Sequence, residues 1–314
     1  MGSMENKIRM NSVVGNLGNI DSCEPLDQGL ESRNFLLSIG SDKYVLKSYK
    51  DTSIDEISFE VSVLNHLKRF TNNFPVPITD VFYVDDLPCV VYTFLEGRGL
   101  LSSDINISTL EKVARLQALM HKNLTGFSPE GNKKRFSIYD FSFLDVFKCE
   151  YLPDVKKLIK TGKSWLLTNL EVHKNTSFPK SIIHEDLEME NILIDKSENI
   201  KFIDFGESHY AEVISDIATA IKELIINNKG FDAKLIEKYL SSYNKTNPII
   251  DKTQLQMLYP LFVRRTMFML SYFLHKQNKS KHSLLDKRIN VEMKSLNLLL
   301  SKNDLVSKII NFSL

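Results

Sequence analysis

Two neighbouring stretches of sequence decide the fold: Ile183-His184-Glu185-Asp186-Leu187-Glu188-Met189-Glu190-Asn191-Ile192-Leu193-Ile194-Asp195 and Ile200-Lys201-Phe202-Ile203-Asp204-Phe205-Gly206-Glu207. In both, short apolar runs typical of strands are separated by polar turns. Asp186 and Asn191 lie on one turn, and Asp204 ends the next strand just before a glycine. We therefore expect these oxygen-bearing side chains to converge. Their oxygens suit Mg²⁺, and phosphoryl transfer needs such a cation together with a carboxylate that orients the attacking hydroxyl.

Upstream of these stretches, a lysine and a glutamate lie thirteen positions apart in a predicted strand and a predicted helix. Lys47 ends the strand-like run 45–47, and Glu60 follows inside an amphipathic helix predicted over 54–70. A strand lysine can hold the α- and β-phosphates of a nucleotide when a helical glutamate fixes it. Alternatively, both are solvated surface charges, which is the usual state of Lys and Glu. Together with the downstream stretches, the spacing favours the ion pair.

The paired stretches resemble the protein-kinase-like superfamily, whose catalytic loop reads His-x-Asp-x4-Asn and whose metal motif reads Asp-Phe-Gly. The resemblance implies that Asp186 is the catalytic base and that His184 orders the loop. It implies that Asn191 and Asp204 hold Mg²⁺ and that ATP is the phosphoryl donor. The alternative, two polar turns in an unrelated α+β domain, explains these residues poorly.

The same resemblance assigns the remaining nucleotide contacts. The polar turn 29–34 would cover the triphosphate through backbone N–H groups, although it lacks a full Gly-x-Gly-x-x-Gly; its candidate residues are Gly29, Ser32 and Asn34. The adenine would bond to backbone around Thr93 and Leu95. Lys47 and Glu60 complete this set.

The order of elements predicts an α+β protein with the two-lobe protein-kinase-like fold. We expect a tail over 1–23, whose first residues read as an expression scar ahead of Met4, and a small β-rich lobe with one helix over 24–94. A connector over 95–99 would join it to a larger, mainly helical lobe over 100–314. Helices there are predicted over 108–121, opened by a capping box at Ser108, and over 216–227, 232–243, 253–275 and 291–300. Pro260 is expected to kink or restart the fourth of these.

Several departures from protein kinases point to the small-molecule branch of the superfamily. No Ala-Pro-Glu occurs, Asp216 follows Asp204 by only twelve positions, and Glu185 replaces the arginine that couples to activation-loop phosphorylation. Asp216-Ile217-Ala218 matches the Asp-x-Ala pattern of that branch. The chain resembles aminoglycoside phosphotransferases, choline kinases and type II homoserine kinases, the last being slightly favoured by the placement of 29–35, 116–121 and 264–268. The insert Glu188-Met189-Glu190 departs from the homoserine kinase pattern.

The acceptor implied by this resemblance is a small molecule with a hydroxyl and an amine. Glu188, Glu190 and Glu207 are the candidate amine ligands because carboxylates form charge-assisted hydrogen bonds with ammonium groups. A solvated acidic turn is the other explanation for them. Tyr139, Asp140 and Tyr259 would line the acceptor cavity or, more simply, belong to the core and surface.

Composition excludes several other classes of protein. The chain has 314 residues, 43% of them hydrophobic and 25% charged, with a formal net charge of +1, so neither nucleic acid nor an anionic membrane is an expected partner. Its three distant cysteines suggest reduced thiols, and the basic run 276–288 suggests a solvated face. We expect a cytoplasmic enzyme that needs no protein partner. A nucleotide-binding pseudokinase or regulatory module, and a protein kinase, are the alternatives.

Overall fold

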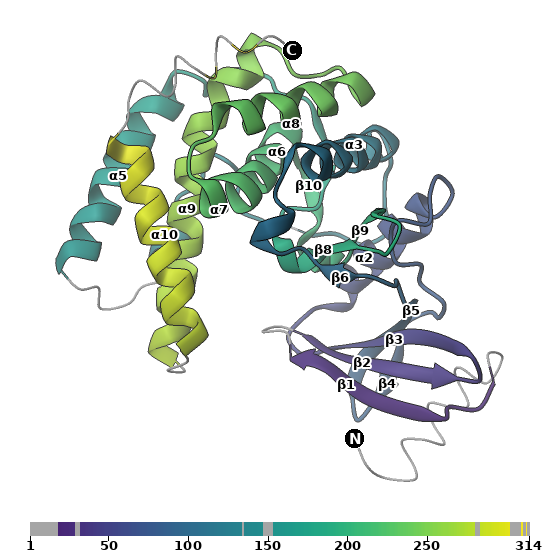
Figure 1. Ribbon diagram of the computed structural model, residues 1–314. Coiled ribbons are helices and arrows are strands. Elements are labelled where there is room, and N and C mark those ends of the chain that lie inside the picture. The colour runs from purple at the N-terminus through teal and green to yellow at the C-terminus, as the bar shows by residue number, and fades with distance from the viewer. Residues whose placement is uncertain are drawn as a thin grey trace.

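The computed structural model describes residues 18–28, 32–133, 135–146, 153–279, 283–301, 309 and 312. Figure 1 shows a small sheet and one helix at one end of the molecule and a larger helical part at the other, which confirms the predicted protein-kinase-like architecture. Most of the predicted tail and Cys149 lie outside the described residues. None of the helices in the described ranges is long and apolar enough to cross a membrane.

The small lobe is built on a five-stranded antiparallel sheet in the order β1-β2-β3-β5-β4. Its strands are β1 (Ser22–Gln28), β2 (Ser32–Ile39), β3 (Asp42–Tyr49), β4 (Phe82–Val84) and β5 (Leu87–Thr93). Successive residues of a strand face opposite sides of the sheet. Leu46 therefore packs into the core on one face, with Leu37 and Val91, while Tyr49 joins the core on the other. Lys47, two residues from Tyr49, faces the helix on that second side.

Helix α2 (Ile54–Leu67) covers this side of the sheet. It begins where the sequence supplies a capping box, because the Ser53 side chain accepts from Glu56 N and the Glu56 carboxylate accepts from Ser53 N. Ile57, Val63 and Leu64 are buried. Glu60 is also buried on this face, next to Lys47.

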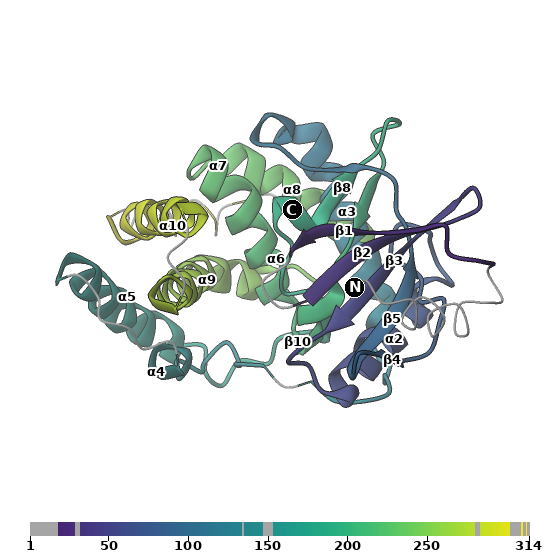
Figure 2. The same cartoon turned by 90° about the horizontal axis from the view of Figure 1, so that it is seen from below.

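The large lobe consists of helices around two small sheets. The sheets are β6-β8-β9 and β10-β7, with strands β6 (Arg98–Gly99), β7 (Lys180–Ile183), β8 (Ile192–Ile194), β9 (Ile200–Phe202) and β10 (His209–Glu212). The α-helices are α3 (Ile107–Leu124), α4 (Phe143–Val146), α5 (Pro153–Glu171), α6 (Val213–Ile221), α7 (Asn227–Lys229), α8 (Ala233–Thr246), α9 (Lys252–Lys279) and α10 (Ser283–Ser301). Short 3-10 turns are η1 (Ser102–Asp104), η2 (Met189–Asn191) and η3 (Phe205–Glu207). Seen from below, α5, α9 and α10 lie together on the side away from the small sheet (Figure 2).

The structure corrects one predicted helix start and excludes a restart of the fourth predicted helix at Pro260. Helix α3 is capped by Asn106, whose side chain accepts from Thr109 N, and not by Ser108. Helix α9 runs through Pro260 without ending there. Tertiary packing overrides the local preference, because the segment on both sides of Pro260 is buried in the core.

Between α6 and α7 the chain forms a π-helical turn, η4 (Lys222–Ile226), all of which is buried. Such π-helical turns are rare in proteins, and those that do occur are often found at functional sites. This one places the charged residues Lys222 and Glu223 inside the lobe.

The predicted connector is partly absorbed into the large lobe. Arg98 and Gly99 pair with Ile194 and Leu193 of β8. Gly97 has φ +148°, and a Cβ there would lie 3.1 Å from the Leu193 Cβ atom and 3.2 Å from the Ile194 carbonyl oxygen. A glycine is needed because the backbone at Gly97 approaches β8 so closely.

Candidate active site

The segment between β7 and β8 is held by a buried histidine. His184 Nε2 lies 3.0 Å from the Ile203 carbonyl oxygen, and the Asp186 N–H donates to His184 Nδ1 at 3.3 Å. A carbonyl can only accept, so Nε2 carries the proton and the ring is neutral. Burial lowers the pKa of His184, which agrees with that state. His184 thereby ties the loop of Asp186 to the strand end that precedes Asp204.

Asp186 is the centre of this loop and is held on both carboxylate oxygens. Its Oδ2 accepts from Asn191 Nδ2 at 3.0 Å, and its Oδ1 accepts from Arg265 Nη2 at 2.9 Å. Asn191 Nδ2 also donates to the Asp186 carbonyl at 2.8 Å. The sequence spacing predicted that these two side chains converge, although not this hydrogen bond. Arg265, on α9, was missed as a partner because nothing in its local sequence links it to the loop.

Arg265 belongs to a chain of buried charges that reaches α10. Its Nε donates to Glu223 Oε1 at 3.1 Å, which also accepts from Lys222 Nζ at 3.1 Å. Lys222 Nζ donates to Glu292 at 2.6 and 2.7 Å, and its side chain has 0% exposure. Every charge in this chain has an opposite partner, as buried ions require. Asp186 is therefore fixed through three helical segments that lie far apart in the sequence.

Lys47 joins the two lobes. Its Nζ donates to Glu60 Oε1 and Oε2 at 2.9 and 3.2 Å and to Asp204 Oδ1 at 2.9 Å. The predicted pair of Lys47 and Glu60 is thus present in this structure, and Lys47 also reaches the carboxylate that follows β9.

Asp204 has one carboxylate oxygen bound to Lys47 and one that could bind a cation. Its backbone is left-handed, with φ 60° and ψ 75°, and its Oδ1 accepts from Gly206 N at 3.2 Å. Among the described residues, the structure records no hydrogen-bond partner for Asp204 Oδ2 or for Asn191 Oδ1. A Cβ on Gly206 would lie 3.0 Å from Asp204 Oδ1, so the glycine keeps this space clear. One carboxylate and one amide oxygen fit Mg²⁺, which takes its other ligands from water and phosphates.

No group of three His, Cys, Asp or Glu side chains within the described ranges could hold a metal without other ligands.

The pKa values of the two carboxylic acids of the site are shifted in opposite directions. Lys47 lowers the pKa of Asp204 from 3.8 to about 2, against the effect of burial. Burial raises the pKa of Asp186 to about 6, although Arg265 opposes this. Neighbouring acids whose environments separate their pKa values commonly have different chemical roles.

The predicted nucleotide contacts are only partly described. Gly29 lies outside the described residues, and of Ser32 only the backbone is described, at the start of β2. Asn34 lies opposite Lys47 in the β2–β3 register. The Thr93 N–H donates to the Val76 carbonyl at 2.9 Å, so it is not available to an adenine. Leu95, half-buried just after β5, keeps the predicted position between the lobes.

The three glutamates predicted to bind an amine are all ion-paired. Arg288 of α10 bridges Glu188 and Glu190, each at 2.6 Å. Glu207 accepts from Arg135 Nε at 2.8 Å, and Arg135 also pairs with Glu56 of α2 at 3.0 Å. The prediction of a solvated basic face over 276–288 is wrong at Arg288, because the tertiary fold brings α10 against the catalytic loop.

Two further sequence candidates belong to the core. The Tyr259 hydroxyl donates to the Leu299 carbonyl at 2.6 Å and is buried, while the Tyr139 hydroxyl donates to the His173 carbonyl at 2.8 Å. Asp216, by contrast, supports the loop: its carboxylate accepts from Gln117, His121 and the Glu185 N–H. Burial opposes these contacts, which nonetheless lower the pKa of Asp216 to about 2.

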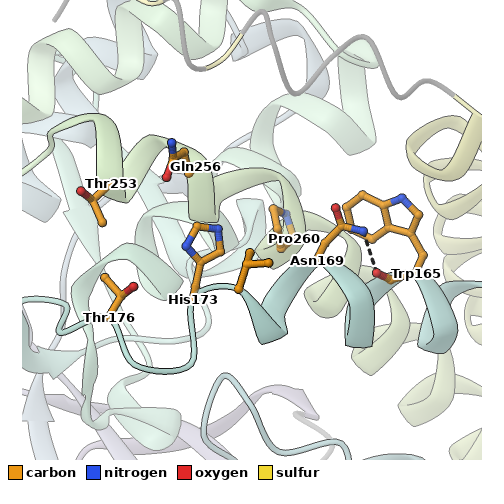
Figure 3. Close-up of a pocket in the computed structure, with 8 residues that line it drawn as sticks. Trp165, Asn169, His173, Thr176, Thr253, Gln256 and Pro260 are labelled. Atoms are coloured by element: carbon orange, nitrogen blue, oxygen red, sulfur yellow. Dashed lines mark hydrogen bonds between the residues drawn. The ribbon is translucent and has the colours of Figure 1, made fainter.

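A cavity of about 520 Å³ lies between α5 and α9 and contains none of these residues. Figure 3 shows its lining, which comes from α5, the turn after it and the first half of α9: Trp165, Asn169, Val172, His173, Thr176, Thr253, Gln256 and Pro260. Its one titratable lining residue is His173, and no carboxylate, lysine or arginine lines it, so the catalytic loop remains the candidate site.

The two-lobed fold and the motifs at its centre define a kinase-type phosphotransferase. The family model described as phosphotransferase enzyme family (APH) matches residues 22–256, and the chain belongs to this family of small-molecule kinases. Homoserine kinase of Paramagnetospirillum magneticum is 25% identical over 246 residues, 74% of each chain. Homoserine kinase of Sinorhizobium medicae is 27% identical over 220 residues, 68% of this chain and 67% of the relative.

Solved structures of the same fold include kinases of several small molecules. Amicoumacin kinase hAmiN, in complex with AMP-PNP, Ca²⁺ and Ami, has a TM-score of 0.69 at 16% identity, covering 90% of this chain and 88% of the other. Choline kinase from Cryptosporidium parvum has a TM-score of 0.68 at 15% identity, covering 93% and 92%. These likenesses establish the shared fold.

Proposed function

We propose that this phosphotransferase moves the γ-phosphoryl group of ATP, with Mg²⁺, to a hydroxyl of a small amine-bearing molecule. The observation that carries the proposal is the set of contacts at the catalytic loop. Asn191 binds Asp186, Lys47 binds both Glu60 and Asp204, and His184 joins the two loops. A base, a phosphate-binding cation and metal-binding oxygens are thus available in one place.

Asp186 acts as the base. It accepts the proton of the acceptor hydroxyl as that oxygen attacks the γ-phosphorus, the bond to the bridging oxygen breaks, and ADP leaves. With a pKa raised by burial to about 6, Asp186 is ionised at neutral pH and closer to the operating pH than an exposed aspartate. The contacts with Asn191 and Arg265 hold its carboxylate in one orientation.

Asn191 and Asp204 would hold Mg²⁺, which neutralises phosphate charge when it is bound. Lys47 would bind the α- and β-phosphates, and Glu60 keeps it in place. In this structure Lys47 contacts Asp204 directly, so the nucleotide and Mg²⁺ would share these two residues. AMP-PNP in the amicoumacin kinase structure supports ATP as the donor.

Homoserine is the first candidate acceptor, because curated relatives over about three quarters of the chain are homoserine kinases. Aminoglycosides and then choline or ethanolamine follow, since fold neighbours act on such compounds. These candidates all carry both a hydroxyl and an amine or quaternary ammonium group.

The test is a coupled ADP-release assay with Mg·ATP against homoserine, choline, ethanolamine and aminoglycosides. We expect acceptor-dependent ADP release with at least one of them and its loss in Asp186→Ala. Binding of Mg·ATP with no acceptor-dependent release, in a panel that also includes sugars, would favour the regulatory alternative. Radiolabelled phosphate on protein and on no small acceptor would favour a protein kinase.

A further inference from the structure

Glu185, between His184 and Asp186, has a backbone conformation that is unusual for its residue type. Its φ is 65°, in the left-handed region, which glycine adopts without steric cost and in which glutamate is strained. The Asp216 carboxylate accepts a hydrogen bond from the Glu185 N–H, and this bond holds the backbone conformation in place. A glycine would satisfy this backbone without strain. Strained residues cluster at functional sites, so the glutamate side chain is the feature to explain.

The Glu185 carboxylate is partly buried and, among the described residues, the structure records no hydrogen bond or ion pair for it. Four other glutamates near the catalytic loop each form an ion pair with an arginine or lysine side chain: Glu188, Glu207, Glu223 and Glu292. Burial raises the pKa of Glu185 to about 7, against the nearby charges of Arg265 and Arg264. Glu185 therefore differs from its neighbours in having a carboxylate whose positive partner is missing.

The two nearest arginines are already engaged. Arg265 binds Asp186 and Glu223, and Arg264 Nη2 donates to the Ser137 carbonyl at 2.7 Å. Neither forms an ion pair with Glu185 in this structure, although the buried Arg264 Nε has no hydrogen-bond partner among the described residues. Because the acceptor hydroxyl must reach the adjacent Asp186, a positive group of the acceptor comes within reach of Glu185.

We propose that Glu185 is the specificity-determining residue that binds the ammonium group of the acceptor, directly beside the base that takes the hydroxyl proton. This rests on the proposed function. Adjacent residues hold the two carboxylates, so the acceptor is a compact molecule with hydroxyl and ammonium a few bonds apart. Small amino alcohols and hydroxy amino acids have that form.

The first experiment measures binding without turnover. With Mg·AMP-PNP present, methylammonium chloride is compared with potassium chloride at equal ionic strength by thermal denaturation. We expect methylammonium to raise the Tm of the wild type more than potassium does, because a ligand of the folded state stabilises it. Glu185→Gln should abolish this difference. Glu198→Gln is the matched control, since Glu198 also has a left-handed φ, of 57°, but pairs with Lys112 at the surface.

The second experiment compares acceptors that differ by the amine: homoserine with 4-hydroxybutyrate, and ethanolamine with ethylene glycol. In the wild type the amine-bearing member should have the higher kcat/KM. Glu185→Gln should lower that kcat/KM about 10- to 100-fold, mainly through KM, and leave the KM for ATP unchanged, because one charge-assisted hydrogen bond is lost. Glu185→Gly should lose the same preference without a lower Tm, since φ 65° suits glycine.

The outcomes separate the two proposals. An ammonium-dependent Tm shift that needs Glu185, with no ADP release from any acceptor, would leave the ammonium site standing and remove the proposed function. An equal Tm shift in wild type and Glu185→Gln, or an amine preference that survives in Glu185→Gln, would overturn the role of Glu185. A Glu185→Gln variant that loses all acceptors equally would overturn it too.

Discussion

The catalytic loop has two sides, and they are held by different kinds of contact. On the nucleotide side, Lys47 reaches Glu60 and Asp204 through hydrogen bonds of 2.9 to 3.2 Å between residues of recognisable motifs. On the acceptor side, Asp186 is held by Arg265, which depends on Glu223 and, through it, on Lys222 and Glu292. On the proposed nucleotide side, the contacts are made by a few motif residues. On the proposed acceptor side, they are made by residues of the helical scaffold, whose sequence can vary with the acceptor.

Electrostatics follows the same division. Lys47 lowers the pKa of Asp204 to about 2, which suits the proposed role of this carboxylate as a metal ligand. Burial raises the pKa of Asp186 to about 6, which suits its proposed role as proton acceptor. The comparison predicts that variants on the two sides fail in different ways.

The largest effect is expected from removing one key residue on each side. Asp186→Ala should lower kcat by about 10²- to 10⁴-fold, because a general base is lost, and leave the Kd for Mg·ATP within a few-fold. Lys47→Ala should weaken Mg·ATP binding as well as turnover. Calorimetric titration with Mg·AMP-PNP separates the two. Equal loss of nucleotide binding in both variants would show that the two sides are not distinct.

Arg265 offers a smaller and more specific test of the acceptor side. Arg265→Gln should lower kcat by about 10- to 100-fold by loosening Asp186, while the KM for ATP is unchanged. It should also destabilise the protein by about 3–5 kcal/mol, because Glu223 loses a buried partner. Arg265→Lys keeps the charge and should recover part of both losses. Steady-state kinetics and urea unfolding measure them, and full activity in Arg265→Gln would remove its positioning role.

The acid stability of the protein tests the support beneath the loop. The folded pKa of Asp216 is lowered from 3.8 to about 2, so the unfolded chain takes up its proton first as the pH falls. Its stabilisation is present above about pH 4 and is lost as the pH falls through about 2, a change of about 2 kcal/mol. Urea unfolding at pH 6, 4 and 2.5 should show a pH-dependent difference between wild type and Asp216→Asn that shrinks with acid. A difference that stays constant would contradict this assignment.

The smallest effect is expected at the half-exposed bridge from α10. Arg288 contacts Glu188 and Glu190, and its side chain is 34% exposed, so solvent weakens these pairs. Arg288→Ala should cost about 1 kcal/mol of stability and a few-fold in kcat. Arg115→Ala removes an exposed pair with Glu111 on α3 and is the control, with about 0.5 kcal/mol at most. If the two variants had the same kcat and the same stability, the contact of α10 with the catalytic loop would have no role in catalysis.

The sequence predicted the meeting of Lys47 with Glu60 and the closeness of the two motifs, because these residues are read from local spacing. Lys47 follows strand alternation, Glu60 follows helical periodicity, and Asp186, Asn191 and Asp204 lie within one short span. The amine ligands could not be predicted in the same way. Glu188, Glu190 and Glu207 were chosen for their closeness in sequence to Asp186, whereas their partners Arg288 and Arg135 come from distant segments.

The amino-acid sequence alone therefore determined the fold class, the kinase motifs and the order of the lobes, because these depend on short-range periodicity and on the few residue types that suit phosphate and Mg²⁺. The tertiary structure decided which charges meet across α9, α10 and the π-helical turn, and that Glu185 is left without a positive partner among the described residues. Such contacts depend on the packing of helices far apart in the chain, and no local pattern records that packing.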